Sequence, residues 1–269
     1  MRTIAITNQK GGCGKTTTSV NLAVALTEKG ERTLIVDLDP QGHSTIGFGF
    51  DPDEISKTIY DALTKSQIPI SEIIMSTKFE RLDLAPSNVL LSGADVELAS
   101  MVGREFVLKK QFKEVTDKYD MCVIDCPPSL GLLTLNALVA STDVLVPVQA
   151  HYYAMEGLKQ LLETANNIKE HLHPCDVKIL GLLLTFVEKK TLLSRQTQKQ
   201  MREYFGDLVF DTVIHKCVRL AEAPSKGESI FTYAPESRSA AEYMALAEEI
   251  INSKASAEQV NKSQALVGR

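Results

Sequence analysis

Residues 10–17 have the sequence Lys-Gly-Gly-Cys-Gly-Lys-Thr-Thr, and this glycine-rich stretch decides the fold. The apolar run Thr3–Asn8 before it is typical of a buried strand. The segment Thr18–Lys29 after it is mostly apolar and predicts a helix that ends near Gly30. A strand, a glycine-rich loop and a helix opening on Gly-Lys-Thr form the context of a phosphate-binding loop. Backbone N–H groups of such a loop face one concavity, and the helix N-terminus adds partial positive charge.

This loop differs from the usual pattern G-x-x-x-x-G-K-[ST] at its first position. The pattern places a glycine where this chain has Gln9, and an additional lysine, Lys10, stands directly before the glycines. Within the loop, Lys15 would reach the β- and γ-phosphates, and the Thr16 hydroxyl would ligate Mg²⁺. The alternative, a glycine turn without a ligand, is disfavoured by the strand and helix on either side.

The composition is ordinary for a globular protein, with 44% hydrophobic and 23% charged residues in a chain of 269. This length allows one large or two small domains with a substantial core. No apolar run approaches the roughly 18–20 residues that a membrane span needs. The first strand begins at once, which leaves no room for a signal peptide. We therefore expect a cytoplasmic protein.

The cysteines and the net charge argue against two further classes of protein. The cysteines form no C-x-x-C pair, so reduced thiols are favoured over a metal site or a disulfide framework. The net charge of −5 argues against a globally basic nucleic-acid binder, although a local basic patch remains compatible with it. The five cysteines are Cys13, Cys122, Cys126, Cys175 and Cys217.

Two further apolar runs end in carboxylates. The run Arg32–Asp39 predicts a second strand whose end carries Asp37 and Asp39. The run Tyr119–Asp125 predicts another strand, which ends in Asp125. A strand-terminal aspartate of a phosphate-loop protein holds Mg²⁺ directly or through water. Taken alone these are ordinary acids at strand ends, but beside a phosphate loop they indicate part of its site.

Strands and helices alternate along the chain, which predicts an α/β fold with a mostly parallel, twisted sheet and helices on both faces. Right-handed crossovers bring the loops at the strand carboxyl ends to one edge. That edge would collect Lys10–Thr17, Asp37, Asp39 and Asp125. We expect one domain over residues 1–252 and a disordered tail over residues 253–269. The expected strands are 3–8, 32–39, 82–86, 119–125, 143–148, 177–185 and 211–214, and the expected helices are 18–29, 59–63, 88–99, 105–118, 154–172, 194–205 and 238–252.

Basic residues gather in two places of the C-terminal half. The segment 189–202 has no acid, and Lys216 and Arg219 flank the end of the last expected strand. A solvated helix face is one explanation. A salt-sensitive, sequence-independent contact with a nucleic-acid backbone is the other. The five basic residues of the first segment are Lys189, Lys190, Arg195, Lys199 and Arg202.

Four motifs occur in one order: Lys10–Thr17, Asp37–Gly42, Ile124–Ser129 and Val218–Gly227. Together they resemble the ParA/Soj family of chromosome- and plasmid-partitioning ATPases, which belongs to the deviant Walker A, MinD/ParA superfamily. The resemblance covers residue 1 to about residue 250. It implies a three-layer P-loop NTPase fold. The chain resembles the short family members that have no N-terminal helix-turn-helix domain.

The resemblance also implies a sandwich dimer, formed on ATP binding, with ATP or ADP and Mg²⁺ at its interface. By position, Lys10 would contact the nucleotide of the other subunit and Asp39 would position the attacking water. Lys10, Lys15 and Asp39 are therefore the expected catalytic residues. Thr16, Asp37 and Asp125 would serve Mg²⁺, with Asp125 acting through water. The expected nucleotide-binding residues are Lys10, Gly11, Gly12, Cys13, Gly14, Lys15, Thr16, Thr17, Asp125, His215 and Cys217.

The family's ATP-bound dimer binds double-stranded DNA non-specifically, and a ParB-like partner stimulates hydrolysis. Lys190, Lys216 and Arg219 fall where the family places DNA-contacting basic residues, which implies association with the nucleoid. Two departures stand out. The family commonly has Pro-Arg-Asn where this chain has His215-Lys216-Cys217, and the charges in 189–195 are placed differently. Contacts of the adenine with the backbone would survive the first change, whereas a contact with an asparagine side chain would not.

Three alternative functions accompany this interpretation. A MinD-like ATPase that binds membrane needs a C-terminal amphipathic helix, which residues 253–269 do not provide. An iron–sulfur reductase or cluster carrier needs interfacial cysteines, and none of the five matches that requirement. Positioning of a protein assembly, such as carboxysomes, on the nucleoid is a third alternative, which the sequence does not distinguish from DNA partition.

Overall fold

The structure is a computed structural model that describes residues 1–150, 172, 175, 177–188 and 191–267, with side chains as far as Ser253. The expected helix 154–172 falls almost entirely outside the described residues, and so does Lys190. Within the described residues, no helix is both long enough and apolar enough to span a membrane.

One sheet forms the centre of the molecule, and its described strands lie in the order β3-β4-β2-β5-β1-β6-β7-β8. β3 pairs with β4 in antiparallel fashion, and the other described pairs are parallel. This confirms the predicted mostly parallel sheet. The strands are β1 Arg2–Ile6, β2 Thr33–Asp37, β3 Met75–Ser76, β4 Leu82–Ala85, β5 Met121–Asp125, β6 Asp143–Gln149, β7 Lys178–Val187 and β8 Val209–His215.

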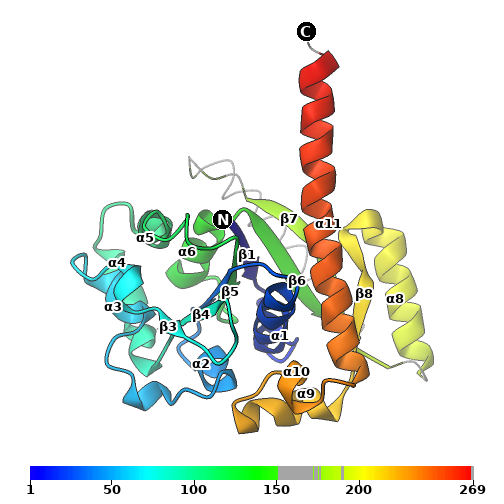
Figure 1. Ribbon diagram of the computed structural model, residues 1–269, viewed down its shortest axis with the longest axis horizontal. Helices are drawn as coiled ribbons and strands as arrows, with labels where there is room; N and C mark the ends of the chain where they lie inside the picture. The colour runs from blue at the N-terminus through cyan, green and yellow to red at the C-terminus, as the bar shows by residue number, and fades with distance from the viewer. Residues whose placement is uncertain (151–171, 173–174, 176, 189–190, 268–269) are drawn as a thin grey trace.

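Helices cover both faces of the sheet, as Figure 1 shows. Alternation along β1 divides the core between the faces, because Ile4 and Ile6 pack with α1 and α11 while Ala5 packs on the side of α3 to α6. The described helices are α1 Lys15–Glu28, α2 His43–Gly47, α3 Ile59–Thr64, α4 Ala94–Ala99, α5 Val107–Phe112, α6 Leu132–Ala140, α8 Leu192–Phe205, α9 Val218–Glu222, α10 Ile230–Tyr233 and α11 Arg238–Val267. Short 3₁₀ turns are η1 Pro52–Glu54, η2 Ile70–Glu72, η3 Val89–Gly93, η4 Arg104–Phe106, η5 Gly206–Leu208 and η6 Ala223–Lys226.

Two expected helices are shorter than the apolar pattern predicts. The segment 88–99 forms η3 and then α4, because the Asn88 side chain accepts a hydrogen bond from the Leu90 N–H and starts a tight turn. The segment 105–118 forms the end of η4 and then α5, which ends at Phe112. Beyond Phe112 the backbone hydrogen bonds join residues three apart, as in the bond from Val115 to Phe112. The sequence analysis did not predict α2, α6, α9 or α10.

The last helix differs from the expectation at its C-terminal end. The sequence pattern predicted a helix that ends at Asn252, followed by a disordered tail, whereas α11 continues to Val267 and projects beyond the sheet (Figure 1). Residues 239–267 contain neither glycine nor proline and are rich in Ala and Glu, so no residue of this segment breaks the helix.

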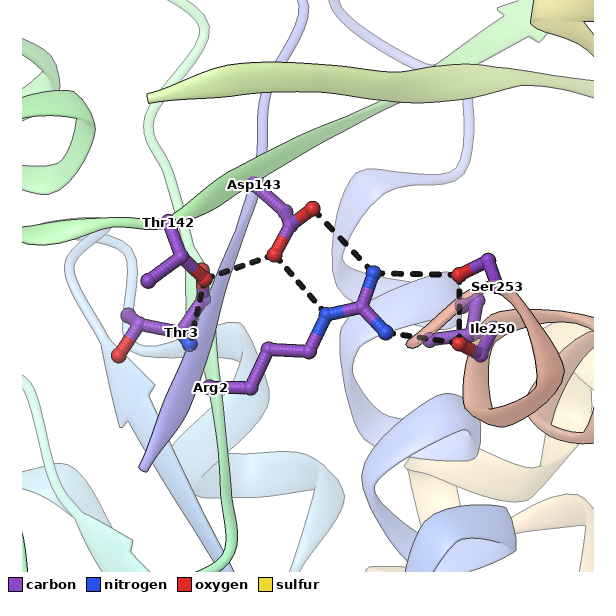
Figure 2. Close-up of polar contacts among 6 residues, drawn as sticks. All are labelled: Arg2, Thr3, Thr142, Asp143, Ile250 and Ser253. Atoms are coloured by element: carbon purple, nitrogen blue, oxygen red, sulfur yellow. Dashed lines mark hydrogen bonds and ion pairs between the residues drawn. The ribbon is translucent and has the colours of Figure 1, made fainter. Parts of the chain in front are cut away.

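A polar cluster fastens α11 to the amino edge of the sheet, where β1 and β6 begin (Figure 2). The Arg2 guanidinium donates to both carboxylate oxygens of Asp143, at 2.9 and 3.2 Å. It also donates to the Ile250 carbonyl at 2.7 Å and to the Ser253 hydroxyl at 3.2 Å. Thr142 completes the cluster through a 2.7 Å hydrogen bond to Asp143. The first strand and the last helix are thereby joined through one arginine side chain.

Candidate phosphate and magnesium site

Three of the predicted motifs meet at the carboxyl edge of the sheet. The strand order places β5 between β1 and β2, and the parallel register aligns Asp125 with both Ile6 and Asp37. The loop after β1 therefore lies next to the loops after β2 and β5. This is the convergence that the alternating pattern predicted.

The loop backbone depends on glycine at two positions. Gly12 has a φ of +69° and Gly14 a φ of +87°, a region that side chains with a Cβ rarely adopt. α1 begins directly after Gly14, and the first turn closes with a 2.9 Å bond from the Thr18 N–H to the Gly14 carbonyl. The helix N-terminus is thus open toward the loop. Lys15 folds back over the loop, where its ammonium donates to the Lys10 carbonyl at 3.2 Å.

Two side chains that the sequence analysis did not single out hold this loop in place. The Asn8 carboxamide accepts from the Lys10 N–H at 3.0 Å and donates to the Pro147 carbonyl at 2.8 Å. The Thr185 hydroxyl, at the end of β7, donates to the Cys13 carbonyl at 2.8 Å. These bonds come from β6 and β7, far along the chain, so the loop sequence alone carries no signal for them.

Asp125 is fully buried and accepts hydrogen bonds from hydroxyl groups. The Ser44 hydroxyl donates at 2.8 Å and the Ser19 hydroxyl at 3.1 Å, and Thr16 is a further partner. Burial raises the pKa of Asp125 above the usual range of a carboxyl group, and these hydrogen bonds oppose the rise.

Asp37 is also fully buried, and its partner is the next residue of α2, Thr45. Both the Thr45 N–H and the Thr45 hydroxyl donate to Asp37 at 2.8 Å, and the Asp39 N–H donates at 3.2 Å. Burial raises the pKa of Asp37, and the nearby charge of Asp125 raises it further. Consecutive residues of α2, Ser44 and Thr45, therefore hold the two carboxylates from one short helix.

Asp39 is the third carboxylate at this edge and is 8% exposed. One carboxylate oxygen accepts from the Gln41 N–H at 3.0 Å, which shapes the turn after β2. The Asp39 carbonyl accepts from the Ser87 hydroxyl at 2.8 Å, which ties this turn to the end of β4. Within the described part of the chain, the other carboxylate oxygen accepts no hydrogen bond.

The chemistry of these groups fits a hard cation bound next to phosphate. Among the described residues, neither Asp37 nor Asp125 takes part in an ion pair. The described side chains also contain no cluster of three or more His, Cys, Asp or Glu that would enclose a metal ion by itself. Mg²⁺ takes one or two protein oxygens and completes its octahedron with water and substrate phosphates. The Thr16 hydroxyl and two buried carboxylates match that requirement.

A cavity of about 80 Å³ lies beside the loop, and the predicted base-pocket residues line it. Gly14 and Thr17, at the start of α1, line it together with His215 and Cys217. The His215 ring contacts α11, where its Nδ1 lies 2.7 Å from a Glu242 carboxylate oxygen. The placement of His215 and Cys217 next to the loop agrees with the expectation, and their contact with a base remains a prediction.

Two of the predicted DNA-contact residues, Lys216 and Arg219, lie within the described part of the chain, directly after β8 and at the start of α9. Lys216 is exposed and forms an ion pair with Glu188 at 2.9 Å, and Arg219 is exposed on α9. Arg202 differs from the solvated or DNA-binding residue that the charge pattern suggested. Its guanidinium donates to the Phe210 and Asp211 carbonyls, so it fastens α8 to β8.

Comparisons with known proteins agree with this geometry. Residues 1–179 match a protein-family model described as an AAA domain. The chain is 48% identical to the sporulation initiation inhibitor protein Soj of Bacillus subtilis, with 92% of this chain and 97% of Soj aligned. It is 44% identical to the chromosome partitioning protein ParA of Myxococcus xanthus, with 93% of this chain and 88% of that protein aligned.

Solved structures show the same fold. The cobyrinic acid a,c-diamide synthase of Mycobacterium smegmatis with bound ADP and magnesium matches with a TM-score of 0.78 and 35% identity, over 92% of each chain. The cell division ATPase MinD of Pyrococcus furiosus matches with a TM-score of 0.77 and 25% identity, over 93% of this chain and 98% of MinD. With its sheet order, its glycine loop and these relatives, the chain belongs to the ParA/Soj family of chromosome-partitioning P-loop ATPases.

Proposed function

We propose that the chain is an ATP-driven switch that partitions DNA. ATP binding produces a homodimer, and this dimer binds double-stranded DNA without sequence preference. Hydrolysis, stimulated by a ParB-like partner, then releases the DNA. The observation that carries the proposal is the carboxyl edge of the sheet, where a phosphate loop and two buried carboxylates without a counter-cation among the described residues converge. Identities of 44–48% to Soj and ParA over almost the whole chain support the biological role.

In this proposal Mg²⁺ and ATP occupy the loop together. The loop N–H groups and Lys15 bind the phosphates, Thr16 ligates the cation, and Asp37 and Asp125 hold its water shell. When bound, Mg²⁺ neutralises phosphate charge and polarises the reacting phosphoryl group. The hydroxyls of Ser19 and Ser44 keep the Asp125 carboxylate in place.

Asp39 and Lys10 serve hydrolysis and dimerisation in the proposal. Asp39 lies in the turn after β2 and would accept the proton of, or orient, the attacking water. Lys10 is exposed at the start of the loop and would reach the nucleotide of the second subunit, as an arginine finger does. A nucleotide bridged by two subunits stabilises the dimer only while its γ-phosphate is present, which makes the dimer the state that ATP selects.

DNA binding in the proposal depends on three basic residues: Lys216 and Arg219, which are exposed, and Lys190, which lies outside the described residues. Contacts of this kind release counterions, so they weaken steeply as salt rises. Lys216 pairs with Glu188 in the structure, and a DNA phosphate would compete for the same ammonium group. The protein would act in the cytoplasm, on the nucleoid.

The test is DNA binding by the full chain with ATP, with ADP and without nucleotide, each at two salt concentrations. We expect tight, salt-sensitive binding with ATP alone, and Asp39→Ala should keep ATP binding while it traps the DNA-bound dimer. Charge reversal of Lys190, Lys216 and Arg219 should weaken binding and reduce its salt dependence. An affinity for DNA that is the same with ATP, with ADP and without nucleotide would refute the proposed switch.

A membrane-binding function is the second candidate, because MinD is a structural neighbour. Flotation with anionic vesicles, run on the same nucleotide states, separates the two functions. The proposal expects ATP-dependent retention on DNA and none on vesicles.

A further inference from the structure

Phe186 has a strained backbone at the carboxyl end of β7. Its φ of 53° lies in the left-handed region, which a bulky side chain seldom adopts. The only other described non-glycine residue with a positive φ is Arg81, outside the site. The pairing of β7 with β8 shifts in register between Leu184 and Val187, which is how a β-bulge redirects a side chain next to an active site. Strain of this kind persists where function requires it.

The redirected ring lies against the phosphate loop. A Cβ built on Gly14 would stand 3.5 Å from Cε2 of Phe186. The ring also lines the cavity of about 80 Å³ beside the loop and remains 38% exposed. Both neighbours of Phe186 are fixed, since Thr185 donates to the Cys13 carbonyl and the Val187 carbonyl accepts from the Lys216 N–H at 3.1 Å. The ring is therefore held in position beside the glycine-rich loop.

The polar side chains around this cavity other than Thr17 already have partners elsewhere. A base that entered it would find their hydrogen-bonding groups engaged, so an apolar, aromatic surface remains as the main contact. Those pairs are His215 with Glu242 and Arg238, Lys216 with Glu188, Cys217 with Ser239, and Tyr243 with Thr18.

We propose that Phe186 recognises the nucleobase by stacking, while the phosphates of the same nucleotide lie on the loop. This inference rests on the proposed nucleotide binding at Lys10–Thr17. Every base offers a π face, so stacking adds affinity with little discrimination between adenine and guanine. Purine rings offer a larger face than pyrimidine rings, so ATP and GTP gain more from this contact than CTP and UTP.

The test compares ATP with inorganic tripolyphosphate, which has the phosphates but no base, by titration calorimetry on the full chain. Phe186→Ala should weaken ATP and ADP about tenfold and leave tripolyphosphate affinity unchanged. Phe186→Tyr keeps the ring and should restore ATP affinity. Tyr204→Ala, which removes a 69% exposed ring on α8, is the matched control and should change neither ligand.

The outcomes separate this inference from the proposed function. Unchanged ATP affinity in Phe186→Ala overturns the stacking role. An equal loss of ATP and tripolyphosphate overturns it too, because the ring would then act only by supporting Gly14. Failure of the proposed function has a different signature: the wild-type chain would bind neither ligand, or Lys15→Ala would still bind both.

Replacing Phe186 with glycine and with alanine separates the effect of the backbone strain on stability from the effect of the ring on ATP affinity. Both variants lose the ring and should lose the same ATP affinity, but glycine adopts a positive φ without strain. Phe186→Gly should therefore unfold about 2–4 °C above Phe186→Ala without nucleotide. A glycine variant that keeps wild-type ATP affinity, or that is no more stable than the alanine variant, would contradict the inference.

Discussion

The two edges of the sheet treat buried carboxylates in opposite ways. At the amino edge, Asp143 is paired with Arg2, and their side chains are 14% and 11% exposed (Figure 2). At the carboxyl edge, Asp37 and Asp125 are fully buried and are bonded only to hydroxyl and backbone N–H groups among the described residues. One edge neutralises its charge within the chain, and the other offers buried carboxyl oxygens, without an ion pair among the described residues, to a cation from outside.

This difference indicates that the amino edge contributes to stability and the carboxyl edge to function. An ion pair enclosed by protein is strongly weakened when one partner is removed, because the other stays buried and charged. Carboxylates without a counter-charge raise the free energy of the folded state until a cation arrives. Removing the Arg2 cation at the amino edge and the Asp125 charge at the carboxyl edge should therefore change stability in opposite directions.

The largest expected effect is that of Arg2→Met, which keeps the side-chain length and removes the cation. It leaves Asp143 buried without its ion pair and also removes the bonds to Ile250 and Ser253. We expect a loss of about 3 kcal/mol in the free energy of unfolding, measured by urea titration, with ATP affinity of the folded protein unchanged.

Arg32→Met is the matched control for Arg2→Met. Arg32 pairs with Asp120 at 2.8 Å, but these side chains are 49% and 36% exposed, so its loss should change stability little. Equal losses in the two variants would contradict the assignment of stability to the amino edge.

Thr45→Val tests the carboxyl edge through a residue that holds a carboxylate. The Thr45 hydroxyl donates to Asp37 and accepts from the Ser87 N–H at 3.0 Å, so valine leaves a buried donor unpaired. We expect a loss of about 2 kcal/mol in urea unfolding. Thr45→Ser keeps both bonds and should lose much less; a serine variant as unstable as the valine variant would locate the effect in the methyl group.

Asp125→Asn should stabilise the nucleotide-free protein, by about 1 kcal/mol at pH 8. The folded state holds the Asp125 proton more tightly than the unfolded state, because the folded pKa is raised. Stability of the wild-type chain therefore falls as the pH rises from about 4 through the raised pKa, and the asparagine variant should show a flatter profile. The Asp125 partners that the structure identifies are hydroxyls, which can turn to accept from an amide.

Thermal unfolding between pH 4 and pH 8, with and without Mg²⁺-ATP, measures both sides of the Asp125→Asn effect. The variant should be more stable alone and gain less from Mg²⁺-ATP than the wild-type chain. Asp37→Asn is the comparison, because Asp37 accepts from two fixed backbone N–H groups that an amide nitrogen cannot satisfy. An Asp125→Asn variant that is less stable than the wild-type chain at every pH would contradict the claim that burial of the Asp125 charge destabilises the folded protein.

The smallest expected effect is that of Ser253→Ala at the amino edge. The serine hydroxyl accepts from Arg2 and donates to the Ile250 carbonyl at 2.7 Å. We expect a loss below about 1 kcal/mol, with faster amide hydrogen exchange in α11 near residue 253. Unchanged exchange there would show that Arg2 alone fastens the helix.

The sequence predicted the parts of the site whose signal is local. The loop Lys10–Thr17 and the strand-ending carboxylates Asp37 and Asp125 are each readable from a short window, and parallel topology then brings them together. Ser44, Thr45 and Thr185 were missed because serine and threonine are common, and their roles depend on partners far along the chain. Phe186 was missed because its backbone conformation arises from a register shift between β7 and β8.

The rest of the fold shows the same difference between features with a local sequence signal and features without one. Buried strands were predicted from apolar runs, whereas the short helices α2, α9 and α10 have too few residues for a periodic pattern. Arg202 carried a misleading signal, because spacing on a helix face does not show whether a guanidinium binds carbonyls of a neighbouring strand.

The Arg2 cluster has a consequence for biosynthesis. β1 is synthesised before the other described strands, but Thr3 bonds to Thr142, 139 residues later, and Arg2 bonds to Ile250, 248 residues later. The nascent chain therefore holds its central strand without either neighbour until more than a hundred further residues are made. Native contacts of such long range form late and slowly, so β1 joins the sheet only after β5 and β6 have been made.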